Sequence, residues 1–396
     1  MRPFEYYSPT KLVFGLDCLK DKLSAELQRV GAKKVLLTYG GGSIKRTGVY
    51  DQVQSELQKA GCTVFELSGI EPNPRVTSVD KGAAICKENQ VDLVLAVGGG
   101  STMDASKAIC AAACYDGPAW DLVLDGSKIK KALPLFTINT IAATGSENDN
   151  TGVITNLETK EKLPIGSPFL WPVVSFLDPS FTYSVPASQI VAGSCDIMSH
   201  FFEAYFVRAL SPIAQGVIEA AERTVMKYTP VVLKDPKNYE ARSKLLWTST
   251  LGCNGFAALG NDPTVFPCHA IEHEVSAYYD ITHGIGLAII TPQLLRYFLE
   301  KDAGLTPRYV EFATNIMELK REDYESDAAL IDAAFKKLED FYRSIGVPAG
   351  LKDVGVTDEH FKAMAEHIDS RWIAPLSAFV VPFTVDDIVE VLKRSL

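Results

Sequence analysis

The sequence predicts an α/β domain over residues 1–187, followed by an all-α domain over residues 188–396. In the first half, short runs of aliphatic and β-branched residues alternate with helical patterns. This order is typical of a parallel sheet with helices on both faces. After about residue 188 strand signals almost vanish and helical periodicity dominates. The change falls at Pro186-Ala187-Ser188, which marks the expected domain boundary.

The strands and helices of the first domain follow from local patterns. Residues 91–97 are apolar except for Asp92, as in a strand whose sheet is covered on both faces. Helices are expected at residues 49–60, where Gly61 ends the pattern, and at residues 76–89. Further strands are expected at residues 34–39, 62–67, 133–139 and 173–177. Strands and helices in this rhythm predict a doubly wound, Rossmann-like domain.

In the second domain, four long spans carry helical periodicity with few strand signals between them. They cover residues 189–208, 212–233, 239–259 and 329–345. Residues 318–328 are largely charged, and we expect a solvated connection there.

Composition limits the classes of partner. The formal net charge is −10 and no basic run occurs, which argues against nucleic acid and anionic membranes as partners. No apolar stretch approaches the roughly 18–20 residues of a membrane span. The eight cysteines form no C-x-x-C pair and most lie in apolar stretches, as reduced core cysteines do. We therefore expect a cytoplasmic protein.

Histidine and aspartate spacing in the second domain indicates a metal site. Four of the six histidines lie between residues 200 and 283. Asp196 and His200 are four residues apart, as are His269 and His273, so each pair shares one face of a helix. With His283, these imidazoles and one carboxylate suit Fe²⁺ or Zn²⁺. The alternative is a set of polar residues satisfied by hydrogen bonds.

The remaining histidines have separate interpretations. His273 shares a helical face with His269, so it is a candidate ligand, proton relay or cofactor contact. His360 and His367 lie in a charged helical pattern, and we expect them at the surface.

A glycine-rich segment in the first domain is a candidate phosphate-binding turn. Residues 98–107 read GGGSTMDASK and directly follow the apolar strand at residues 91–97. Glycines let backbone N–H groups approach a pyrophosphate, and the positive end of the following helix favours an anion. The alternative is a tight turn with Ser101 or Thr102 as the helix cap. The glycine spacing differs from the G-x-G-x-x-G pattern of dinucleotide-binding turns, so that pattern does not decide between the two interpretations.

Two further segments follow expected strands. Residues 40–46 read GGGSIKR, without the carboxylate that NAD enzymes commonly use for the ribose 2′-hydroxyl and with two cations, which favours NADP(H). The alternative is a surface turn with solvated Lys45 and Arg46. Residues 144–147, TGSE, come after the strand at residues 133–139, near the edge where open α/β sheets bind ligands.

With these motifs the chain resembles the iron-containing (group III) alcohol dehydrogenase family, in particular its NADP-using butanol dehydrogenase and aldehyde reductase branch. The resemblance covers nearly the whole chain. It is carried by GGGSTMDASK at 98–107, TGSE at 144–147, the segment from Asp196 to His200, HAIEHE at 269–274 and His283-Gly284. It implies a dehydroquinate-synthase-like fold and one divalent metal, Fe²⁺ or Zn²⁺, on Asp196, His200, His269 and His283.

The resemblance also implies roles for residues around a nicotinamide cofactor. Gly99, Gly100 and Ser101 would hold its phosphates, and Asp104 would approach the nicotinamide end. His273 matches the histidine placed near the nicotinamide. The remaining matches are Asn73, Thr140, Thr144 and Lys162, which would line the cofactor cleft, and Gly41, Gly42 and Ser43, which would accept the 2′-phosphate of NADP(H).

The implied activity is hydride transfer between NADP(H) and short- to medium-chain aldehydes or primary alcohols, by an enzyme of the butanol dehydrogenase type that we expect to be a homodimer. A polyol dehydrogenase and a dehydroquinate-synthase-type lyase are the alternatives on this fold. The family often shows Asp-Trp-x-x-His before the third ligand, but residues 262–269 here read DPTVFPCH. Substrate preference is therefore open, and Cys268 makes oxidation sensitivity an expectation. Aromatic candidates for the pocket, or simply for the core, are Phe256, Phe266, Tyr278 and Trp372.

Overall fold

The computed structural model describes residues 1–263, 265–371 and 375–396, so Thr264 and Trp372 lie outside the described residues. The chain forms two compact units. One comprises Tyr7–Pro186 and Asp235–Asn254, and the other Met1–Tyr6, Ala187–Lys234 and Gly255–Leu396. The expected division at residue 187 is therefore modified in two places. Residues 1–6 belong to the helical unit, and residues 235–254 belong to the unit that contains the sheet.

Buried polar contacts explain why residues 235–254 belong with the sheet. Helix α9 (Tyr239–Thr250) ends in Thr250, whose hydroxyl donates to Glu147 at 2.6 Å. The amide of Asn148 donates to the carbonyl oxygen of Thr250 at 3.4 Å. The expected helix over residues 239–259 therefore ends early, and its last turn contacts the segment after a strand of the sheet.

The first unit is built on a parallel sheet with the strand order β1-β8-β5-β4-β2-β3. In that order the strands are Lys11–Phe14, Val174–Leu177, Leu135–Asn139, Leu93–Gly98, Lys34–Tyr39 and Thr63–Leu67. The five expected strands are present, with ends shifted by up to two residues. The sequence did not predict β1, whose four residues are too few for a clear pattern. It also missed the antiparallel hairpin β6 (Thr151–Asn156) and β7 (Glu161–Gly166).

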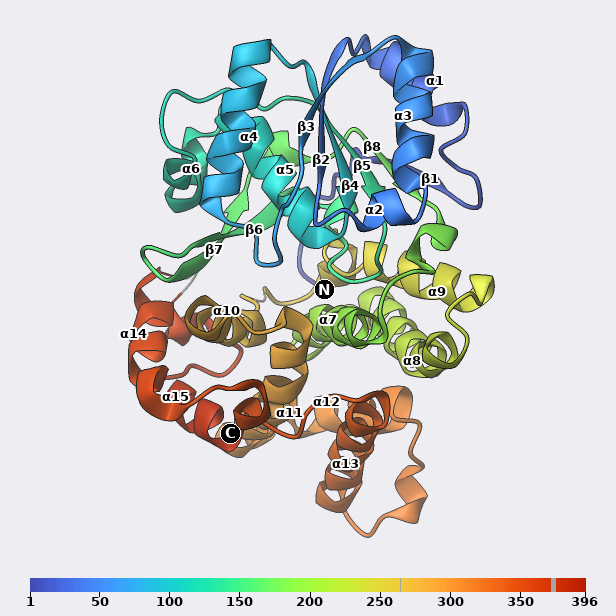
Figure 1. Cartoon of the computed structure of the whole chain (residues 1–396). Coiled ribbons are helices and arrows are strands. Elements are labelled where there is room, and N and C mark those ends of the chain that lie inside the picture. The colour runs from blue at the N-terminus through green and yellow to red at the C-terminus, as the bar shows by residue number, and fades with distance from the viewer. Residues whose placement is uncertain (264, 372–374) are drawn as a thin grey trace. The chain divides into compact units, whose positions relative to one another are not determined.

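Helices cover both faces of this sheet (Figure 1). Helices α1 (Lys22–Val30) and α3 (Val49–Ala60) lie on one face, and α4 (Val76–Asn89) and α5 (Gly100–Ala112) on the other. Alternate residues of β2 enter the two cores: Val35 and Leu37 pack on the α1/α3 side, and Leu36 on the α4/α5 side. Burial on both faces is the reason these strands read as continuous apolar runs.

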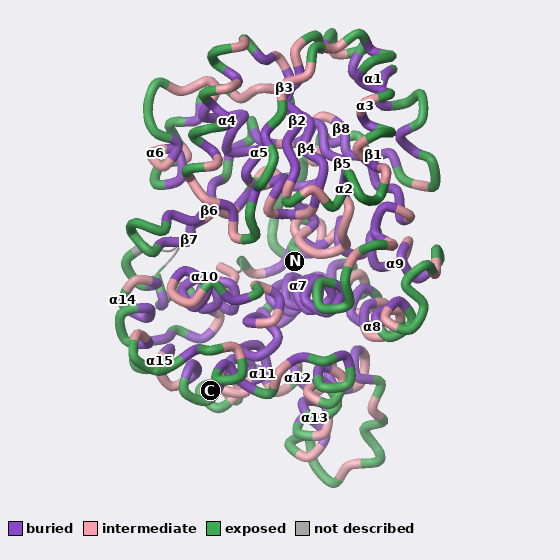
Figure 2. The backbone as a smooth tube through the Cα atoms, in the orientation of Figure 1, coloured by how far each residue is buried: buried purple, intermediate pink, exposed green. Residues whose placement is uncertain are grey.

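The second unit is helical, and none of its described residues forms a strand. Its central helix α7 (Ala187–Tyr205) is buried at every position from Ile190 to Tyr205 (Figure 2). Burying charged residues in a helix that is covered on all sides is costly, so Asp196, His200 and Glu203 of α7 are candidates for a functional role. The other long helices are α8 (Pro212–Lys234), α10 (Pro267–Tyr279), α11 (His283–Lys301), α13 (Asp327–Ile345), α14 (Phe361–Arg371) and α15 (Val385–Arg394), with the short α12 (Thr306–Glu311) between them.

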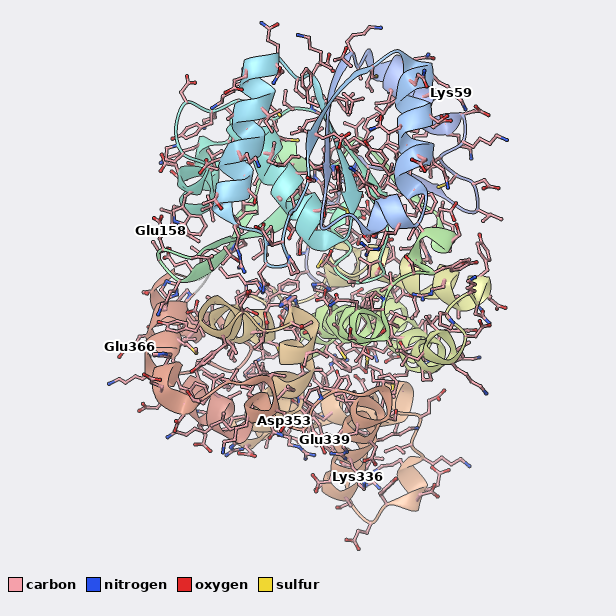
Figure 3. The ribbon with its side chains drawn as sticks, in the orientation of Figure 1. Lys59, Glu158, Lys336, Glu339, Asp353 and Glu366 are labelled. Atoms are coloured by element: carbon pink, nitrogen blue, oxygen red, sulfur yellow. The ribbon has the colours of Figure 1, made fainter. Side chains whose placement is uncertain are left out.

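His360 and His367, which the sequence predicts to lie at the surface, are both partly exposed. The His367 Nδ1 atom lies 2.8 Å from the buried carboxylate of Glu274, and the His360 ring packs 4.9 Å from that of Tyr278. Charged residues such as Lys59 and Glu366 instead project outward from their helices (Figure 3). In the described parts of the chain, no helix combines the length and apolarity needed to cross a membrane.

Candidate functional site

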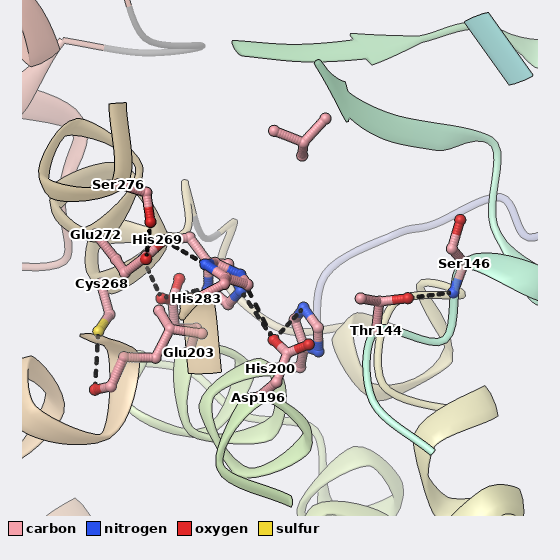
Figure 4. Close-up of polar contacts among 12 residues, drawn as sticks. Thr144, Ser146, Asp196, His200, Glu203, Cys268, His269, Glu272, Ser276 and His283 are labelled. Atoms are coloured by element: carbon pink, nitrogen blue, oxygen red, sulfur yellow. Dashed lines mark hydrogen bonds and ion pairs between the residues drawn. The ribbon is translucent and has the colours of Figure 1, made fainter. Parts of the chain in front are cut away.

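Four side chains from three helices converge in the helical unit. Asp196 and His200 project from α7, His269 from α10, and His283 is the first residue of α11 (Figure 4). The Nε2 atoms of the three histidines lie 3.6, 3.6 and 3.7 Å from the Oδ1 atom of Asp196. Ligand atoms around one tetrahedral Zn²⁺ are about 3.3 Å apart. Each nitrogen therefore lies near ligand spacing from the Asp196 oxygen, and Asp196, His200 and His269 form a set whose donor atoms all lie within 4.8 Å of one another.

Burial distinguishes a cation site from a hydrogen-bonded cluster. Asp196 is only 3% exposed. Among the described residues, its Oδ1 atom and the Nε2 atom of His269 are buried without a hydrogen-bond partner, and so is Nδ1 of His200. Leaving such atoms unsatisfied is costly, and a bound cation would satisfy the converging ones. The donor set fits a first-row divalent metal, with three imidazole nitrogens and one carboxylate oxygen.

The charges of the cluster also fit a cation. Burial alone would raise the pKa of Asp196, but the neighbouring histidines outweigh it, so the pKa lies well below its ordinary value. Burial lowers the pKa of His200 to about 4, which keeps its imidazole neutral and able to bind metal. For His269, the carboxylates of Glu203 and Asp196 overcome burial and raise the pKa to about 9. A metal at this position would therefore displace a proton.

Two carboxylates behind the histidines fix the orientation of the rings. Glu203 on α7 accepts hydrogen bonds from the backbone N–H of His269 at 2.9 Å and from its Nδ1 at 3.0 Å. Glu272 on α10 contacts Nδ1 of His283 and accepts a hydrogen bond from the Ser276 hydroxyl. A proton held on Nδ1 leaves the Nε2 lone pair directed at the site. Sequence reasoning missed both residues, although Glu203 lies seven positions after Asp196 and thus on the same helical face.

Glu203→Leu is expected to weaken metal binding by about 10–100-fold, because the His269 ring loses the acceptor that orients it. The measurement is a competition titration with a chelator of known affinity. Glu203→Gln is the matched comparison, since its amide oxygen can still accept both N–H groups, and it should keep most of the affinity. A Leu variant that binds metal as tightly as the Gln variant would contradict this role.

His273 lies close to the same cluster. Its ring centroid is 6.0 Å from that of His269 and 5.3 Å from that of His283. Donor atoms of Glu272, His273 and His283 lie within 4.8 Å of one another, a second set that could hold a metal. Because Glu272 already contacts Nδ1 of His283, this second set is better explained as a polar environment around the first. The role of His273 stays a prediction.

The segment before His269 forms one wall of the cluster. The ring of Phe266 lies 6.3 Å from that of His200 and 5.6 Å from that of His269. The thiol of Cys268 points instead toward the Thr291 hydroxyl, 3.2 Å away. Cys268 is 2% exposed, and burial raises its pKa well above the ordinary value. A buried, protonated thiol reacts poorly with oxidants, so the structure does not support the expected oxidation sensitivity.

In the sheet unit, the glycine turn after β4 is closely packed. A Cβ atom at Gly99 would lie 2.5 Å from Ile141, and one at Gly100 would lie 2.4 Å from Thr144. The turn after β4 can therefore approach the turn after β5 this closely only because residues 99 and 100 are glycines. The cap of α5 is Gly99, with no side-chain capping bond, so neither Ser101 nor Thr102 acts as the cap. The N–H groups of Thr102 and Met103 donate to the carbonyl oxygen of Gly99, both at 3.1 Å, so the N–H groups available to an anion at this helix start are those of Gly100 and Ser101.

Asp104, on the first turns of α5, is held by a buried network. Its Oδ1 atom accepts from the Ser146 hydroxyl at 2.6 Å and its Oδ2 atom from the Val153 N–H at 3.0 Å. Burial raises the pKa of Asp104 to about 6. Lys107, fully buried, donates to Ser146 at 2.9 Å and pairs with Asp149. This network fixes the turn at residues 144–147 against α5, and the sequence did not predict it.

The other predicted cofactor residues belong to the same unit. Gly41, Gly42 and Ser43 follow β2, and Thr140 and Thr144 follow β5, at the carboxyl edge of the parallel sheet. The hairpin joins the segments that contain Asn73 and Lys162. Thr155 is paired with Lys162 and donates its N–H to the carbonyl oxygen of Pro74 at 2.8 Å. Ligands of open α/β sheets bind at this edge.

Comparison with known proteins agrees with this geometry. Residues 9–179 match the family described as iron-containing alcohol dehydrogenase, and residues 190–396 match the C-terminal family of Fe-containing alcohol dehydrogenases. NADH-dependent butanol dehydrogenase B of Clostridium acetobutylicum is 45% identical over 100% of both chains. The NADPH-dependent aldehyde reductase YqhD of Escherichia coli is 33% identical over 95% of both chains.

Solved structures show the same fold. The crystal structure of NADH-dependent butanol dehydrogenase A from Thermotoga maritima is similar with a TM-score of 0.94 and 37% identity, covering 100% of this chain and 99% of that one. The family implies a divalent metal, usually iron, and a nicotinamide cofactor. The predicted dehydroquinate-synthase-like fold is confirmed. The chain belongs to the iron-containing alcohol dehydrogenase family and is an oxidoreductase, as the sequence predicted.

Proposed function

We propose that this protein reduces short- to medium-chain aldehydes, and oxidises the corresponding primary alcohols, with a divalent metal and a nicotinamide cofactor. The observation that carries the proposal is the convergence of three imidazole nitrogens on the carboxylate oxygen of Asp196 at 3.6–3.7 Å. A divalent ion held there would supply Lewis-acid polarisation of the substrate oxygen. The proposed ligands are Asp196, His200, His269 and His283.

The protein's own residues position the reactants. Glu203 and Glu272 keep the Nε2 atoms of His269 and His283 directed at the ion. Gly99, Gly100 and Ser101, at the start of α5, are proposed to bind the cofactor phosphates through backbone N–H groups. Asp104 is proposed to contact the nicotinamide end. Asn73, Thr140, Thr144 and Lys162 are proposed to line the remainder of the cofactor site. The turn of Gly41, Gly42 and Ser43 after β2 is proposed to contact the adenosine ribose.

His273 is proposed as the residue that exchanges the proton of the substrate oxygen. Its Nδ1 atom is buried. The Nε2 atom is therefore the one proposed to donate the proton during reduction and accept it during oxidation. The position of this ring, beside those of His269 and His283, supports the assignment.

The chemistry of the wall supports the proposed substrate class. Phe266 places an aromatic ring beside His200 and His269, which suits an aliphatic aldehyde such as butanal better than a polyol. The polyol dehydrogenase alternative stays a prediction. Family membership leaves the lyase alternative without support, since the relatives are named as dehydrogenases and reductases.

The choice of cofactor is a separate proposal. The sequence predicted NADP(H), but the comparisons do not confirm it. Four relatives at 41–45% identity are named NADH-dependent, whereas YqhD is named NADPH-dependent. We propose NAD(H) as the preferred cofactor, because of the charges around Lys45 described below. A homodimer and a cytoplasmic location remain predictions, and light scattering during gel filtration tests the first.

The test is oxidation of NADH and of NADPH, side by side, with butanal, before and after chelation and re-addition of Fe²⁺ or Zn²⁺. We expect turnover that chelation abolishes and metal restores, with NADH the better cofactor. His269→Ala should lose both bound metal and turnover while its circular dichroism spectrum is unchanged. Unaltered turnover in that variant would refute the site assignment, and full activity of the chelated protein would refute the metal requirement.

A further inference from the structure

A carboxylate that the sequence did not associate with the cofactor lies beside the turn after β2. Glu66, on β3, accepts a hydrogen bond from the Tyr39 hydroxyl at 2.6 Å, and the Tyr50 hydroxyl also donates to it. Gln54 donates to the same carboxylate at 3.3 Å. The ammonium nitrogen of Lys45 lies 3.9 Å from its Oε2 atom. Both oxygens of Glu66 are thus held in place by groups from β2 and the two helices that follow it.

The parallel pairing of β2 and β3 produces this arrangement. Leu37 lies opposite Glu66, so Glu66 projects from the same sheet face as Leu37 and Tyr39. Helix α3 covers that face and supplies Tyr50 and Gln54. The carbonyl oxygen of Gly40 accepts the N–H of Gly42 at 2.9 Å and that of Gly69 at 3.1 Å, which joins the turns after the two strands. Glu66 is therefore a neighbour of the turn, although 23 residues separate it from Ser43 in the sequence.

Lys45 is the cation most affected by this carboxylate. It belongs to the short helix α2 (Ser43–Arg46), which begins at the proposed ribose-binding turn. Its ammonium lies 5.1 Å from the ring centroid of Tyr39 and 4.6 Å from that of Tyr50. Burial would raise the pKa of Glu66, but the hydrogen bonds from Tyr39 and Tyr50 and the charge of Lys45 lower it, so Glu66 is ionised at neutral pH. The positive charge of Lys45 is therefore offset.

We propose that Glu66 is a specificity-determining residue that disfavours NADP(H) and leaves NAD(H) as the preferred cofactor. It holds Lys45 against Tyr39 and Tyr50 and adds negative charge next to Gly41, Gly42 and Ser43. A 2′-phosphate on the ribose would meet this charge, whereas a 2′-hydroxyl would not. The inference rests on the proposed function, in which that turn contacts the adenosine ribose.

The test measures equilibrium binding of NADPH and NADH to the full-length protein by titration of nicotinamide fluorescence, without aldehyde. Glu66→Gln removes the charge and keeps oxygen and amide groups for the two tyrosines. We expect its Kd for NADPH to fall by about fivefold, as for a partly exposed charge pair, while the Kd for NADH changes less than twofold. The double variant Lys45→Met/Glu66→Gln should lose this gain, because Lys45 supplies it.

Asp51→Asn is the matched control, since it removes one exposed negative charge from α3, next to Tyr50. It should leave the ratio of the two Kd values unchanged, and thermal unfolding should confirm that Glu66→Gln is folded. An unchanged ratio in Glu66→Gln, or an equal change in Asp51→Asn, would overturn the proposal while the dinucleotide site stands. Failure of the wild-type protein to bind either nucleotide would overturn the dinucleotide site itself, and the proposal with it.

Discussion

Asp196→Ala is expected to abolish metal retention and aldehyde reduction, with the fold preserved. The carboxylate oxygen of Asp196 is the atom on which the three histidine nitrogens converge. Its removal leaves three nitrogens without the only negative charge of the proposed ligand set. Changing a residue that merely orients a ligand typically costs about 10–100-fold in metal affinity, so loss of a ligand should exceed 100-fold. Metal content after gel filtration and competition with a chelator measure the effect.

Asp332→Ala serves as the control for Asp196→Ala. Asp332 is a carboxylate of the same unit whose side chain is 77% exposed on α13, far from any proposed metal ligand in the sequence. It should bind metal and turn over as the wild type does. Circular dichroism and thermal unfolding separate metal loss from unfolding. Retention of one metal ion per chain in Asp196→Ala, at unchanged affinity, would show that the ion binds elsewhere.

Gly284→Ala is expected to destabilise the helical unit strongly, because among the described glycines an added Cβ atom would make its closest approach to another atom at Gly284. A Cβ atom at Gly284 would lie 1.9 Å from the carbonyl oxygen of Ala192 and 2.7 Å from its carbonyl carbon. Both atoms belong to the backbone of α7, so no side-chain rotation relieves the overlap, and α11 and α7 must separate. Overpacking of this kind costs about 3 kcal/mol or more in the free energy of unfolding. In a unit of this size that corresponds to a fall in Tm of about 6–12 °C.

The same variant should also weaken metal binding. Gly284 follows His283 directly, and Ala192 lies one helical turn before Asp196. Moving α11 away from α7 therefore separates two of the proposed ligands. Gly216→Ala in α8 is the matched control, because its Cβ would meet no atom within 4 Å. That variant should be more stable than the wild type by about 0.5–1 kcal/mol. Equal Tm values for the two variants would contradict the close approach of α7 and α11.

The local sequence pattern was sufficient to predict helices with a clear stop signal and strands that are buried on both faces. Helices α3 and α4 begin and end at the predicted residues, since glycine or a left-handed residue ends each one. The strands of the parallel sheet were recognised because burial on both faces makes them apolar throughout. β1 and the hairpin β6/β7 were missed: the former is four residues long, and the latter contains Pro164 and mixes buried polar residues with apolar ones.

The amino-acid sequence by itself determined the family through its motifs and the two kinds of domain through their periodicity. It also offered four candidate metal ligands, because spacing along a helix brings Asp196 and His200 to one face and only two other nearby histidines accompany His269. The tertiary structure decided how segments far apart in the chain meet. It placed His283 of α11 against Asp196 of α7, put Glu203 behind His269, and assigned α9 to the sheet unit through Glu147. It also brought Glu66 to Lys45, which no local pattern could show, since pairing of parallel strands depends on the register of the whole sheet.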